Sequence, residues 1–298
     1  MTETAPAPRF RAALVQMTTS RSVEGNLRAA SDLIRDAARQ GAEYVQTPEV
    51  TTLMELDRAK LFVDTRPEEG NPAIAHFRAL ARELKIWLHI GSMGIAVAAD
   101  KLANRAFLID PTGRLVARYD KIHMFDVKLP GGETYRESRN YRRGEKAVVA
   151  DLPWGKLGIT ICYDLRFPAL YRALAKAGAE IIAIPSAFTV KTGTAHWQAL
   201  MRARAIETGC WVLAAAQTGK HECGRETYGH SIVVAPWGEV VGELGVETGL
   251  LLADIDMGAV AAARAQVPSL THDRPFDVIG AAESLESEGK AIEDSKVA

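Results

Sequence analysis

The sequence predicts an α/β protein in which helices cover the sheets of one layered domain. Three observations lead to this prediction. Short runs of Val, Ile, Leu and Ala recur along the 298 residues, helical patterns separate several of them, and paired strand patterns with glycine turns lie between. Strands buried on both faces are almost continuously apolar, whereas a helix lying on a sheet repeats its apolar residues every three or four positions.

Nine apolar runs are predicted to be strands buried mainly on both faces. They are RAALVQM (11–17), EYVQTPE (43–49), WLHIGSMGIAV (87–97), RAFLID (105–110), LGITICYD (157–164), EIIAIPSAF (180–188), CWVLAAAQ (210–217), SIVVAP (231–236) and LLLADID (250–256). Two further stretches, DPTGRLVARYDK (110–121) and APWGEVVGEL (235–244), have a glycine between apolar runs and predict strand–turn–strand units.

Four segments have the apolar spacing of helices, and Gly41 ends the first of them. They are EGNLRAASDLIRDAARQG (24–41), NPAIAHFRALARELK (71–85), PALYRALAKAGA (168–179) and TAHWQALMRARAIETG (194–209). No linker or repeat divides the chain, so we predict one domain over residues 1–282. Residues 283–298 are polar and poor in large apolar side chains, and we expect a flexible tail there.

The composition argues against several classes of protein. With 36 basic and 37 acidic residues the net charge is −1, so no bulk attraction to nucleic acid or to an anionic membrane is expected. No apolar run approaches the roughly 18 to 20 residues of a membrane span, and the polar start MTETAPAPRF lacks the pattern of a leader peptide. The three cysteines have no metal-binding spacing. We therefore expect a cytoplasmic protein that needs no metal or cofactor.

Cys162 is the candidate nucleophile. It closes the strand pattern KLGITICYD and is followed by the helical pattern LRFPALYRALAKAG. At such a strand-to-helix turn, free backbone N–H groups can support the negative charge of a thiolate. An isolated cysteine is more often a buried structural residue, and Cys210, inside an apolar run, fits that role. Cys223 lies in a predicted loop without a clear partner.

Glu49 and Lys121 are the candidate acid–base and cationic partners of this thiol. Glu49 follows a buried strand pattern and a proline, and Lys121 stands at the end of a strand pattern beside aromatic residues. Isolated glutamates and lysines are usually solvated. However, α/β sheets collect their active sites at the carboxyl ends of their strands, and Glu49, Lys121 and Cys162 all fall at such ends.

The segments that carry these three residues resemble the nitrilase superfamily of carbon–nitrogen hydrolases. The similarity extends over about residues 9–278, and it includes PE (48–49), KIHMFD (121–126), GGETYRES (131–138) and GITICYDLRFP (158–168). Within the superfamily, RARAIETGCWVLAAAQTGKH and YGHSIVV are most similar to the deaminated glutathione amidases, in the ω-amidase branch. Thr194 and Ala235 stand where those relatives usually have Pro and Asp, which affects loop detail only.

The resemblance implies a four-layer αββα sandwich and a Glu49–Lys121–Cys162 triad, with Glu137 as a second carboxylate that holds Lys121. In this scheme Glu49, a desolvated carboxylate with a raised pKa, takes the thiol proton and later activates water. Cys162 attacks the amide carbon, expels ammonia and leaves a thioester. Lys121 and the backbone N–H of Tyr163 stabilise the oxyanion. For Glu137, a solvated loop carboxylate is the alternative.

Substrate binding is predicted less directly. Arg166 could hold the 2-oxo acid end of an anionic amide with a bidentate fork, or it could instead pair with Asp164. Phe188 and Thr192, in the loop after IIAIPSAF, are pocket walls by resemblance. His196 and Trp197 are expected to pack and cap the following helix rather than to catalyse.

The favoured function is an amidase that acts on deaminated glutathione. The alternatives are a 2-oxoglutaramate ω-amidase, an N-carbamoyl amino acid hydrolase and a nitrilase. A non-catalytic scaffold would be expected to lack a triad member, and a redox-sensing thiol protein would need a second cysteine near Cys162. Relatives pair subunits through the helices beside the nucleophile, so we expect a homodimer or a higher homo-oligomer.

Overall fold

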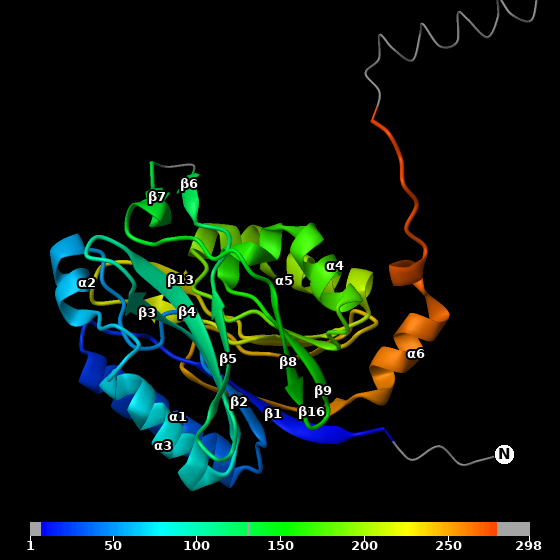
Figure 1. Cartoon of the computed structure of the whole chain (residues 1–298), viewed down its shortest axis with the longest axis horizontal. Coiled ribbons are helices and arrows are strands. Elements are labelled where there is room, and N and C mark those ends of the chain that lie inside the picture. The colour runs from blue at the N-terminus through cyan, green and yellow to red at the C-terminus, as the bar shows by residue number, and fades with distance from the viewer. Residues whose placement is uncertain (1–6, 130–131, 279–298) are drawn as a thin grey trace, which may run out of the picture.

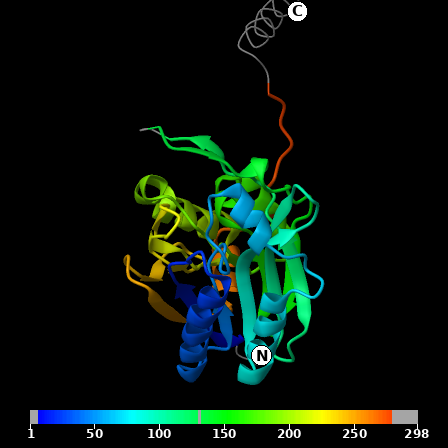
Figure 2. The ribbon, with the colours of Figure 1, turned by 90° about the vertical axis from the view of Figure 1, so that its left-hand side faces the viewer.

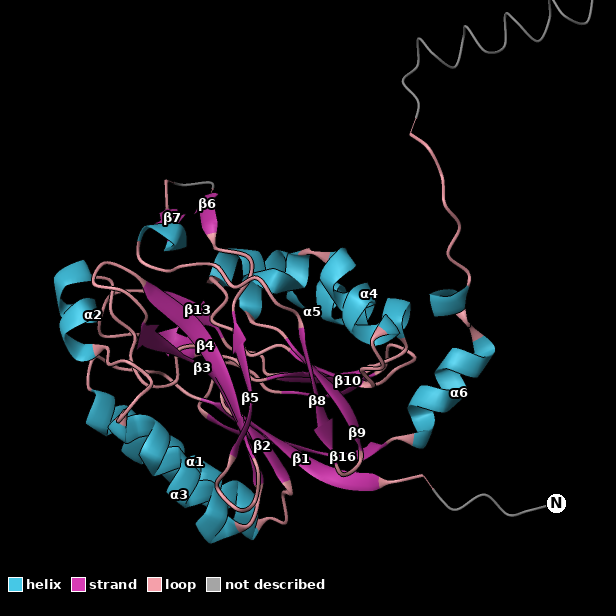
Figure 3. Ribbon diagram, viewed as in Figure 1, coloured by secondary structure: helices cyan, strands magenta, loops and turns pink. Residues whose placement is uncertain are grey.

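Two six-stranded sheets pack face to face, and helices cover the outer face of each (Figures 1 and 3). The computed structural model describes residues 7–129 and 132–278. The α/β class and the predicted four-layer αββα sandwich are confirmed. The polar tail predicted for residues 283–298, and the end of the predicted domain at residue 282, lie outside the described residues.

The first sheet has the strand order β16-β1-β2-β3-β4-β5. Its strands are β1 (Arg9–Gln16), β2 (Tyr44–Gln46), β3 (Trp87–Ala96), β4 (Leu102–Ile109), β5 (Leu115–Asp120) and β16 (Gly249–Asp256). β1, β2 and β3 are parallel, while β16, β4 and β5 pair antiparallel to their neighbours. Two reversals follow β3, so β5 runs in the same direction as β2, and both strands end at the same edge of the sheet.

The second sheet has the order β15-β14-β11-β10-β9-β8. Its strands are β8 (Val148–Leu152), β9 (Gly155–Ile159), β10 (Ile181–Ala183), β11 (Trp211–Ala214), β14 (Ile232–Val234) and β15 (Val240–Glu243). β9, β10 and β11 are parallel, and the flanking strands are antiparallel. Each sheet therefore has one antiparallel strand, three parallel strands and two further antiparallel strands.

Alternate residues of β1 show how the layers pack. Ala12 and Leu14 face the second sheet, whereas Ala13 and Val15 join the core beneath α1 (Val23–Arg39) and α3 (Pro72–Leu84). These two helices lie side by side on the outer face of the first sheet (Figure 2). On the opposite face of the molecule, α4 (Pro168–Lys176) and α5 (Val190–Thr208) cover the second sheet. The near-continuous apolar strands thus follow from burial on both faces.

Local sequence explains where the main helices begin and end. The Ser22 side chain accepts a hydrogen bond from the Gly25 N–H at the start of α1, and Asn71 caps α3 ahead of Pro72. Thr189 caps α5, so this helix begins at Val190, whereas the sequence pattern predicts a start at Thr194. It ends at Gly209, which has the left-handed conformation of a helix C-cap.

Several shorter elements surround the sandwich, and the sequence patterns do not predict them. They are α2 (Arg58–Asp64), the hairpins β6 (Asp126–Lys128)–β7 (Thr134–Arg136) and β12 (Thr218–Lys220)–β13 (Glu226–Tyr228), α6 (Gly258–Gln266), and the 3-10 turns Glu137–Arg139, Cys162–Arg166 and Ser269–Thr271. The β6–β7 hairpin projects from the body of the molecule beyond α2 and α5 (Figure 1). Among the described residues, no helix has both the length and the apolarity needed to cross a membrane.

Candidate active site

Glu49 lies in a tight turn beyond the end of β2. Ser92 on β3 holds this turn, because its hydroxyl accepts a hydrogen bond from the Val50 N–H at 2.9 Å and its carbonyl accepts one from the Thr51 N–H. Val50 has a φ of 51°, which is unfavourable for a β-branched residue. At Gly91 a Cβ atom would lie 2.0 Å from the carbonyl oxygen of Thr47. Only glycine therefore lets the turn pack this closely against β3.

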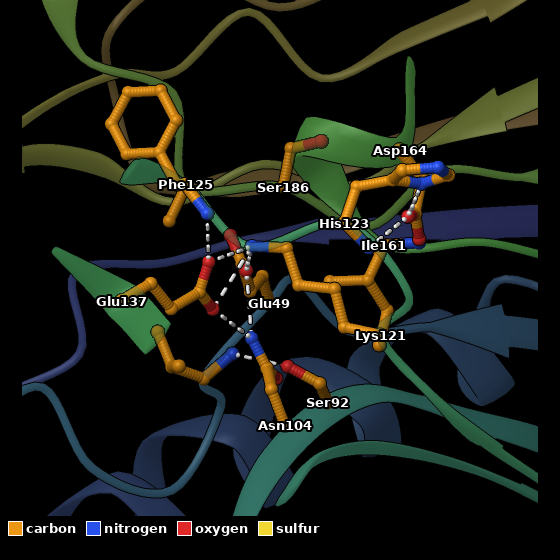
Figure 4. Close-up of polar contacts among 12 residues, drawn as sticks. Glu49, Ser92, Asn104, Lys121, His123, Phe125, Glu137, Ile161, Asp164 and Ser186 are labelled. Atoms are coloured by element: carbon orange, nitrogen blue, oxygen red, sulfur yellow. Dashed lines mark hydrogen bonds and ion pairs between the residues drawn. The ribbon is translucent and has the colours of Figure 1, made fainter. Parts of the chain in front are cut away.

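Lys121 follows directly after β5, at the same edge of the sheet as Glu49. Its side chain is 2% exposed, and its Nζ donates to Glu49 Oε1 at 2.8 Å and to Glu137 Oε2 at 2.9 Å. In Figure 4 the ammonium lies between the two carboxylates. Glu49 and Lys121 are thus in contact, as the sequence predicts, and the ammonium forms ion pairs with two carboxylates.

Glu137 reaches this cluster from the 3-10 turn after β7. Its Oε2 accepts a hydrogen bond of 2.7 Å from the Phe125 N–H, and its side chain is 13% exposed. Asn104 on β4 ties the two carboxylates together, since its Nδ2 donates to Glu49 Oε1 at 2.9 Å and to Glu137 Oε1 at 3.2 Å. Glu137 is therefore a partly buried member of the cluster and not a solvated loop carboxylate.

Cys162 begins the 3-10 turn that links β9 to α4, as the strand-to-helix pattern predicts. The residue is 6% exposed and has a φ of 51°, a left-handed conformation that few side chains adopt. Its N–H donates to the Pro185 carbonyl beyond β10 at 3.0 Å. The backbone beyond the second sheet thus holds the Cys162 turn in place, and the thiol itself hydrogen-bonds the Glu49 side chain.

Asp164 connects the Cys162 segment to the Lys121 segment. It is fully buried, and its carboxylate accepts hydrogen bonds from the Tyr119 hydroxyl at 2.6 Å, the Ile161 N–H at 2.9 Å and the His123 N–H at 3.0 Å. The His123 ring also contacts Asp164, through Nδ1 at 2.7 Å (Figure 4). Asp164 therefore couples the ends of β5 and β9, and it forms no ion pair with Arg166.

Burial and neighbouring charges act in opposite directions on the pKa values of Glu49 and Lys121. Burial raises the pKa of Glu49, but the charge of Lys121 and the hydrogen bond from it outweigh burial, so the pKa lies below its ordinary value. The raised pKa predicted for Glu49 is thus wrong. Burial lowers the pKa of Lys121, yet Glu137 and Glu49 raise it well above its usual range. Burial and the charge of Glu49 raise the pKa of the Cys162 thiol. At neutral pH Cys162 is therefore a thiol, Glu49 a carboxylate and Lys121 an ammonium.

A cavity of about 450 Å³ opens onto these groups. It is lined by Glu49, Lys121, Glu137 and Cys162 together with the four predicted substrate-binding residues Tyr163, Arg166, Phe188 and Thr192. The Arg166 guanidinium lies 5.6 Å from the Phe188 ring centre and contacts His196 Nδ1 at 3.2 Å. A cavity of this size with a few convergent polar groups is typical of a small-molecule site.

Two details of the sequence interpretation need correction. Thr192 lies in the first turn of α5, where its hydroxyl contacts that of Thr189, and not in a loop. Thr189, not His196 or Trp197, caps this helix. Trp197 does pack as expected: it is 1% exposed, and its indole N–H donates to the His230 carbonyl at 2.7 Å.

The cavity also contains residues that the sequence analysis does not identify, among them Asn104, Tyr141 and Arg225. Asn104 interrupts the apolar strand LANRAFLI, and a polar residue inside a buried strand is a signal that could have been noticed. Tyr141 and Arg225 lie in loops, where nothing in the local pattern marks them. Within residues 7–129 and 132–278, no group of three or more His, Cys, Asp or Glu side chains is arranged to hold a metal ion.

Comparisons with known proteins agree with this geometry. Residues 11–265 match the carbon–nitrogen hydrolase family model. The deaminated glutathione amidase of Synechocystis sp. is 40% identical over 267 residues, which are 88% of this chain and 97% of that protein. The crystal structure of Saccharomyces cerevisiae Nit3, a member of branch 10 of the nitrilase superfamily, is 29% identical and covers 93% of this chain and 100% of its own, with a TM-score of 0.82.

The crystal structure of the Caenorhabditis elegans NitFhit protein is also similar, with a TM-score of 0.83 and 37% identity over 91% of this chain. The alignment covers 66% of the NitFhit chain. The fold and site thus define a hydrolase that acts on carbon–nitrogen bonds. The chain belongs to the carbon–nitrogen hydrolase family, within the nitrilase superfamily, and is an amidase of that family.

Proposed function

We propose that this amidase uses Cys162 as its nucleophile, Glu49 as its general base and Lys121 as its oxyanion-stabilising cation, with Glu137 holding the lysine. One observation carries the assignment. The Glu49–Lys121–Glu137 cluster and the Cys162 thiol come from different sheets, yet they meet in the wall of the same cavity. This meeting of the two groups supports the triad that the ordered segments of the sequence predict.

The first half of the reaction follows from the charges. The Cys162 sulfur attacks the amide carbon while Glu49 takes the thiol proton, and the electron pair of the C=O bond moves to oxygen. Direct proton transfer from a thiol with a raised pKa to a carboxylate with a lowered pKa is unfavourable, so we expect it to be coupled to the attack. Lys121 and the Tyr163 N–H then stabilise the oxyanion. Collapse breaks the C–N bond, and the leaving amine takes the proton from Glu49.

The second half reverses these roles. A water molecule attacks the thioester carbon while Glu49 removes its proton, and the same cation stabilises the second oxyanion. Collapse breaks the C–S bond, returns the proton to sulfur and releases a carboxylic acid. Lys121 contacts Glu49. In this scheme the ammonium is therefore beside the negative charge both when it is on the Glu49 carboxylate and when it is on the oxyanion.

We propose deaminated glutathione as the substrate, because relatives that are 40% identical over 88% of the chain carry that name. This compound has one carboxylate on its 2-oxo acyl part and another on the cysteinylglycine part. The amidase would therefore release cysteinylglycine, whereas the ammonia expected from the sequence would be released only from a primary amide such as 2-oxoglutaramate. Arg166 is positioned to bind one carboxylate, and Phe188 and Thr192 to contact the apolar part.

The test is a panel of deaminated glutathione, 2-oxoglutaramate, an N-carbamoyl amino acid, a nitrile and pentanamide. The first two share 2-oxoglutarate as their acid product, so its release can be followed for both. One charged hydrogen bond contributes about 1.5 to 3 kcal/mol, roughly tenfold to over a hundredfold in kcat/KM. Deaminated glutathione should rank first, then 2-oxoglutaramate, then pentanamide. A higher kcat/KM for pentanamide than for both anionic amides would contradict the substrate assignment.

We further propose that the enzyme is a cytoplasmic homodimer without a metal or organic cofactor. Exposed apolar side chains support an interface beside α5: Ile206 is 53% exposed and Trp237 is 52% exposed. Exposed apolar residues of this size are often covered by a second subunit. Light scattering should give twice the monomer mass, and Ile206→Glu should shift it toward the monomer. A monomeric wild type would contradict the dimer, and loss of activity on chelation would contradict the absence of a metal.

A further inference from the structure

Arg225 is a cation in the cavity that the proposed mechanism does not use. It lies between β12 and β13, in the wall that also contains Ala187 and Phe188. Its Nη2 donates to the Ala187 carbonyl, its Nη1 contacts the Met54 sulfur at 4.0 Å, and the guanidinium lies 5.6 Å from the ring centre of Tyr135 on β7. These contacts fix the guanidinium but do not neutralise its charge.

Arg225, which is partly buried, differs in its partners from two other arginines that are buried or partly buried. Arg204 pairs with Glu207 at 2.8 Å, and Arg105 pairs with Asp120 and with Glu68 at 2.7 Å. Arg225 has no carboxylate within ion-pairing distance among the residues that the structure describes, and its Nε is buried without any hydrogen-bond partner there. A buried donor on an uncompensated cation is costly. A ligand that brings a carboxylate would satisfy both the charge and the Nε–H group.

The position of Arg225 indicates which carboxylate it could meet. Its anchor, Ala187, also provides the backbone N–H that hydrogen-bonds the Cys162 sulfur, and the charge of Arg225 helps to lower the pKa of Glu49. Arg166 instead lies beside His196, Tyr163 and Phe188. Arg225 is thus close to the reacting atoms, where the acyl part of the substrate is attached during the reaction.

We infer that Arg225 binds the carboxylate of the 2-oxo acyl group and so selects acidic acyl chains. This inference rests on the proposed function. It moves the 2-oxo acid end from Arg166, where the sequence placed it, to Arg225. Arg166 is then available for the second carboxylate, on the leaving group of deaminated glutathione. Of the four arginines that line the cavity, Arg166 and Arg225 would then bind the two carboxylates of this substrate.

The experiment measures kcat/KM for 2-oxoglutaramate, which has only the acyl carboxylate, and for pentanamide, which has the same five-carbon chain and no carboxylate. Arg225→Met should lower the value for 2-oxoglutaramate roughly tenfold to over a hundredfold and change that for pentanamide by less than about threefold. Arg225→Lys keeps the charge but loses the bidentate guanidinium, so kcat/KM for 2-oxoglutaramate should fall by an intermediate factor. This variant replaces Arg225→Met in the test if the methionine variant does not fold. Arg143→Met, at an exposed arginine outside this cavity, is the control and should change neither value.

Two results would overturn the inference. An equal loss for both amides in a folded Arg225→Met protein would mean that Arg225 only balances the charge of the Glu49–Lys121–Glu137 cluster. Loss of the preference for 2-oxoglutaramate in Arg166→Met, but not in Arg225→Met, would restore the placement on Arg166. With deaminated glutathione, Arg166→Met should cost more than it costs with 2-oxoglutaramate.

A binding measurement separates this inference from the proposed function. Calorimetry with 2-oxoglutarate and the Cys162→Ala protein requires no turnover. Binding that weakens at least tenfold in Cys162→Ala/Arg225→Met would support Arg225 even if no amide of the panel is hydrolysed. Absent binding to the Cys162→Ala protein, or equal binding to both proteins, would contradict it.

Discussion

The two sheets share one strand pattern and yet carry different parts of the proposed catalytic site. Each has three parallel strands with one antiparallel strand on one side and two on the other. The first sheet carries Glu49, Asn104 and Lys121, and the side chains of Asn104 and Lys121 both donate hydrogen bonds to the Glu49 carboxylate. The second carries Cys162, which is held by a backbone hydrogen bond and a left-handed conformation.

This difference separates two ways of fixing a catalytic group. In the first sheet, each charge is stable because an opposite charge or an amide lies beside it, so removing one group leaves the others uncompensated. In the second sheet, the turn itself places Cys162, the proposed nucleophile, so a change of its side chain need not disturb its surroundings. Substitutions in the first sheet should therefore affect both activity and stability, and those at Cys162 activity alone.

The largest effect is expected for Cys162→Ala. Because no other residue of the cavity is positioned to form the acyl-enzyme, turnover should be abolished. The far-ultraviolet circular dichroism spectrum and the unfolding midpoint should stay close to those of the wild type, since the turn remains. Turnover and circular dichroism are measured on the same sample. Residual activity in a folded variant would remove the nucleophile assignment.

Glu49→Gln should lower kcat by several orders of magnitude, because the amide keeps the shape but cannot accept a proton. It should also change the pH dependence of stability. The folded-state pKa of Glu49 lies below its ordinary value of 4.5. Ionised Glu49 therefore stabilises the fold above pH 4.5, and this stabilisation is lost as the pH falls through the folded-state pKa.

Urea unfolding at several pH values measures this effect. The difference in the free energy of unfolding between wild type and Glu49→Gln should be constant near neutrality and should shrink below pH 4.5. A difference that grows on acidification would contradict the direction of the pKa shift. Near-wild-type hydrolysis of a good amide by Glu49→Gln would contradict its role as the base.

Lys121→Ala should reduce activity through a different loss. It removes the cation that would stabilise the oxyanion, a loss of ~3 to 4 kcal/mol in transition-state stabilisation. It also leaves the side chains of Glu49 and Glu137 without the ammonium that lies between them. The protein should also unfold about 3 kcal/mol more readily, as when one partner of a buried ion pair is deleted. Steady-state kinetics and urea unfolding check both effects. A fully stable variant would mean that the first-sheet cluster tolerates an uncompensated charge.

Position along the chain explains how much of this site the sequence predicts. Glu49, Lys121 and Cys162 each follow a strand pattern, so local sequence suffices to place each at a strand end. Glu49 and Lys121 lie at one edge of the first sheet, and Cys162 lies beyond β9 of the second. Asn104 contacts Glu49 and Glu137 only because of the register between β3, β4 and β5, which no short pattern encodes. Arg225 enters the cavity from a distant hairpin, and only the packing of the two sheets brings it there.

Local sequence patterns also predict only part of the fold. The long strands and the amphipathic helices α1, α3, α4 and α5 are predicted because burial imposes their periodicity. Helix α2 has only seven residues, and the three-residue strands of the two hairpins are largely exposed, so they lack the apolar runs that mark the equally short β2, β10 and β14. The pKa of Glu49 was predicted in the wrong direction for a related reason: burial is readable from apolar neighbours, whereas the proximity of Lys121 is a tertiary contact.

Asp164→Asn tests the hydrogen bonds that connect the Lys121 segment of the first sheet to the Cys162 segment of the second. An amide cannot accept all the hydrogen bonds that Tyr119, His123 and Ile161 donate to the carboxylate, so a buried donor is left unpaired at about 1 to 3 kcal/mol. We expect kcat to fall roughly tenfold with little change in KM, because Asp164 positions Lys121 and Cys162 without touching substrate. Asp32→Asn, on the exposed side of α1, is the control. A change in KM alone would show that Asp164 acts on binding and not on alignment.

The smallest effect is expected for Cys210→Ala, the second-sheet cysteine without catalytic geometry. Cys210 is fully buried before β11, its sulfur lies 3.2 Å from the Ala179 carbonyl, and it accepts a hydrogen bond from Arg264 at 3.1 Å. Its loss should leave a small cavity and lower the free energy of unfolding by about 1 kcal/mol, with kcat unchanged. Thermal unfolding and turnover, compared with Cys162→Ala, measure this contrast. A substantial fall in kcat at a temperature where the variant is folded would show that placement at the strand-to-helix turn is not what distinguishes the two thiols.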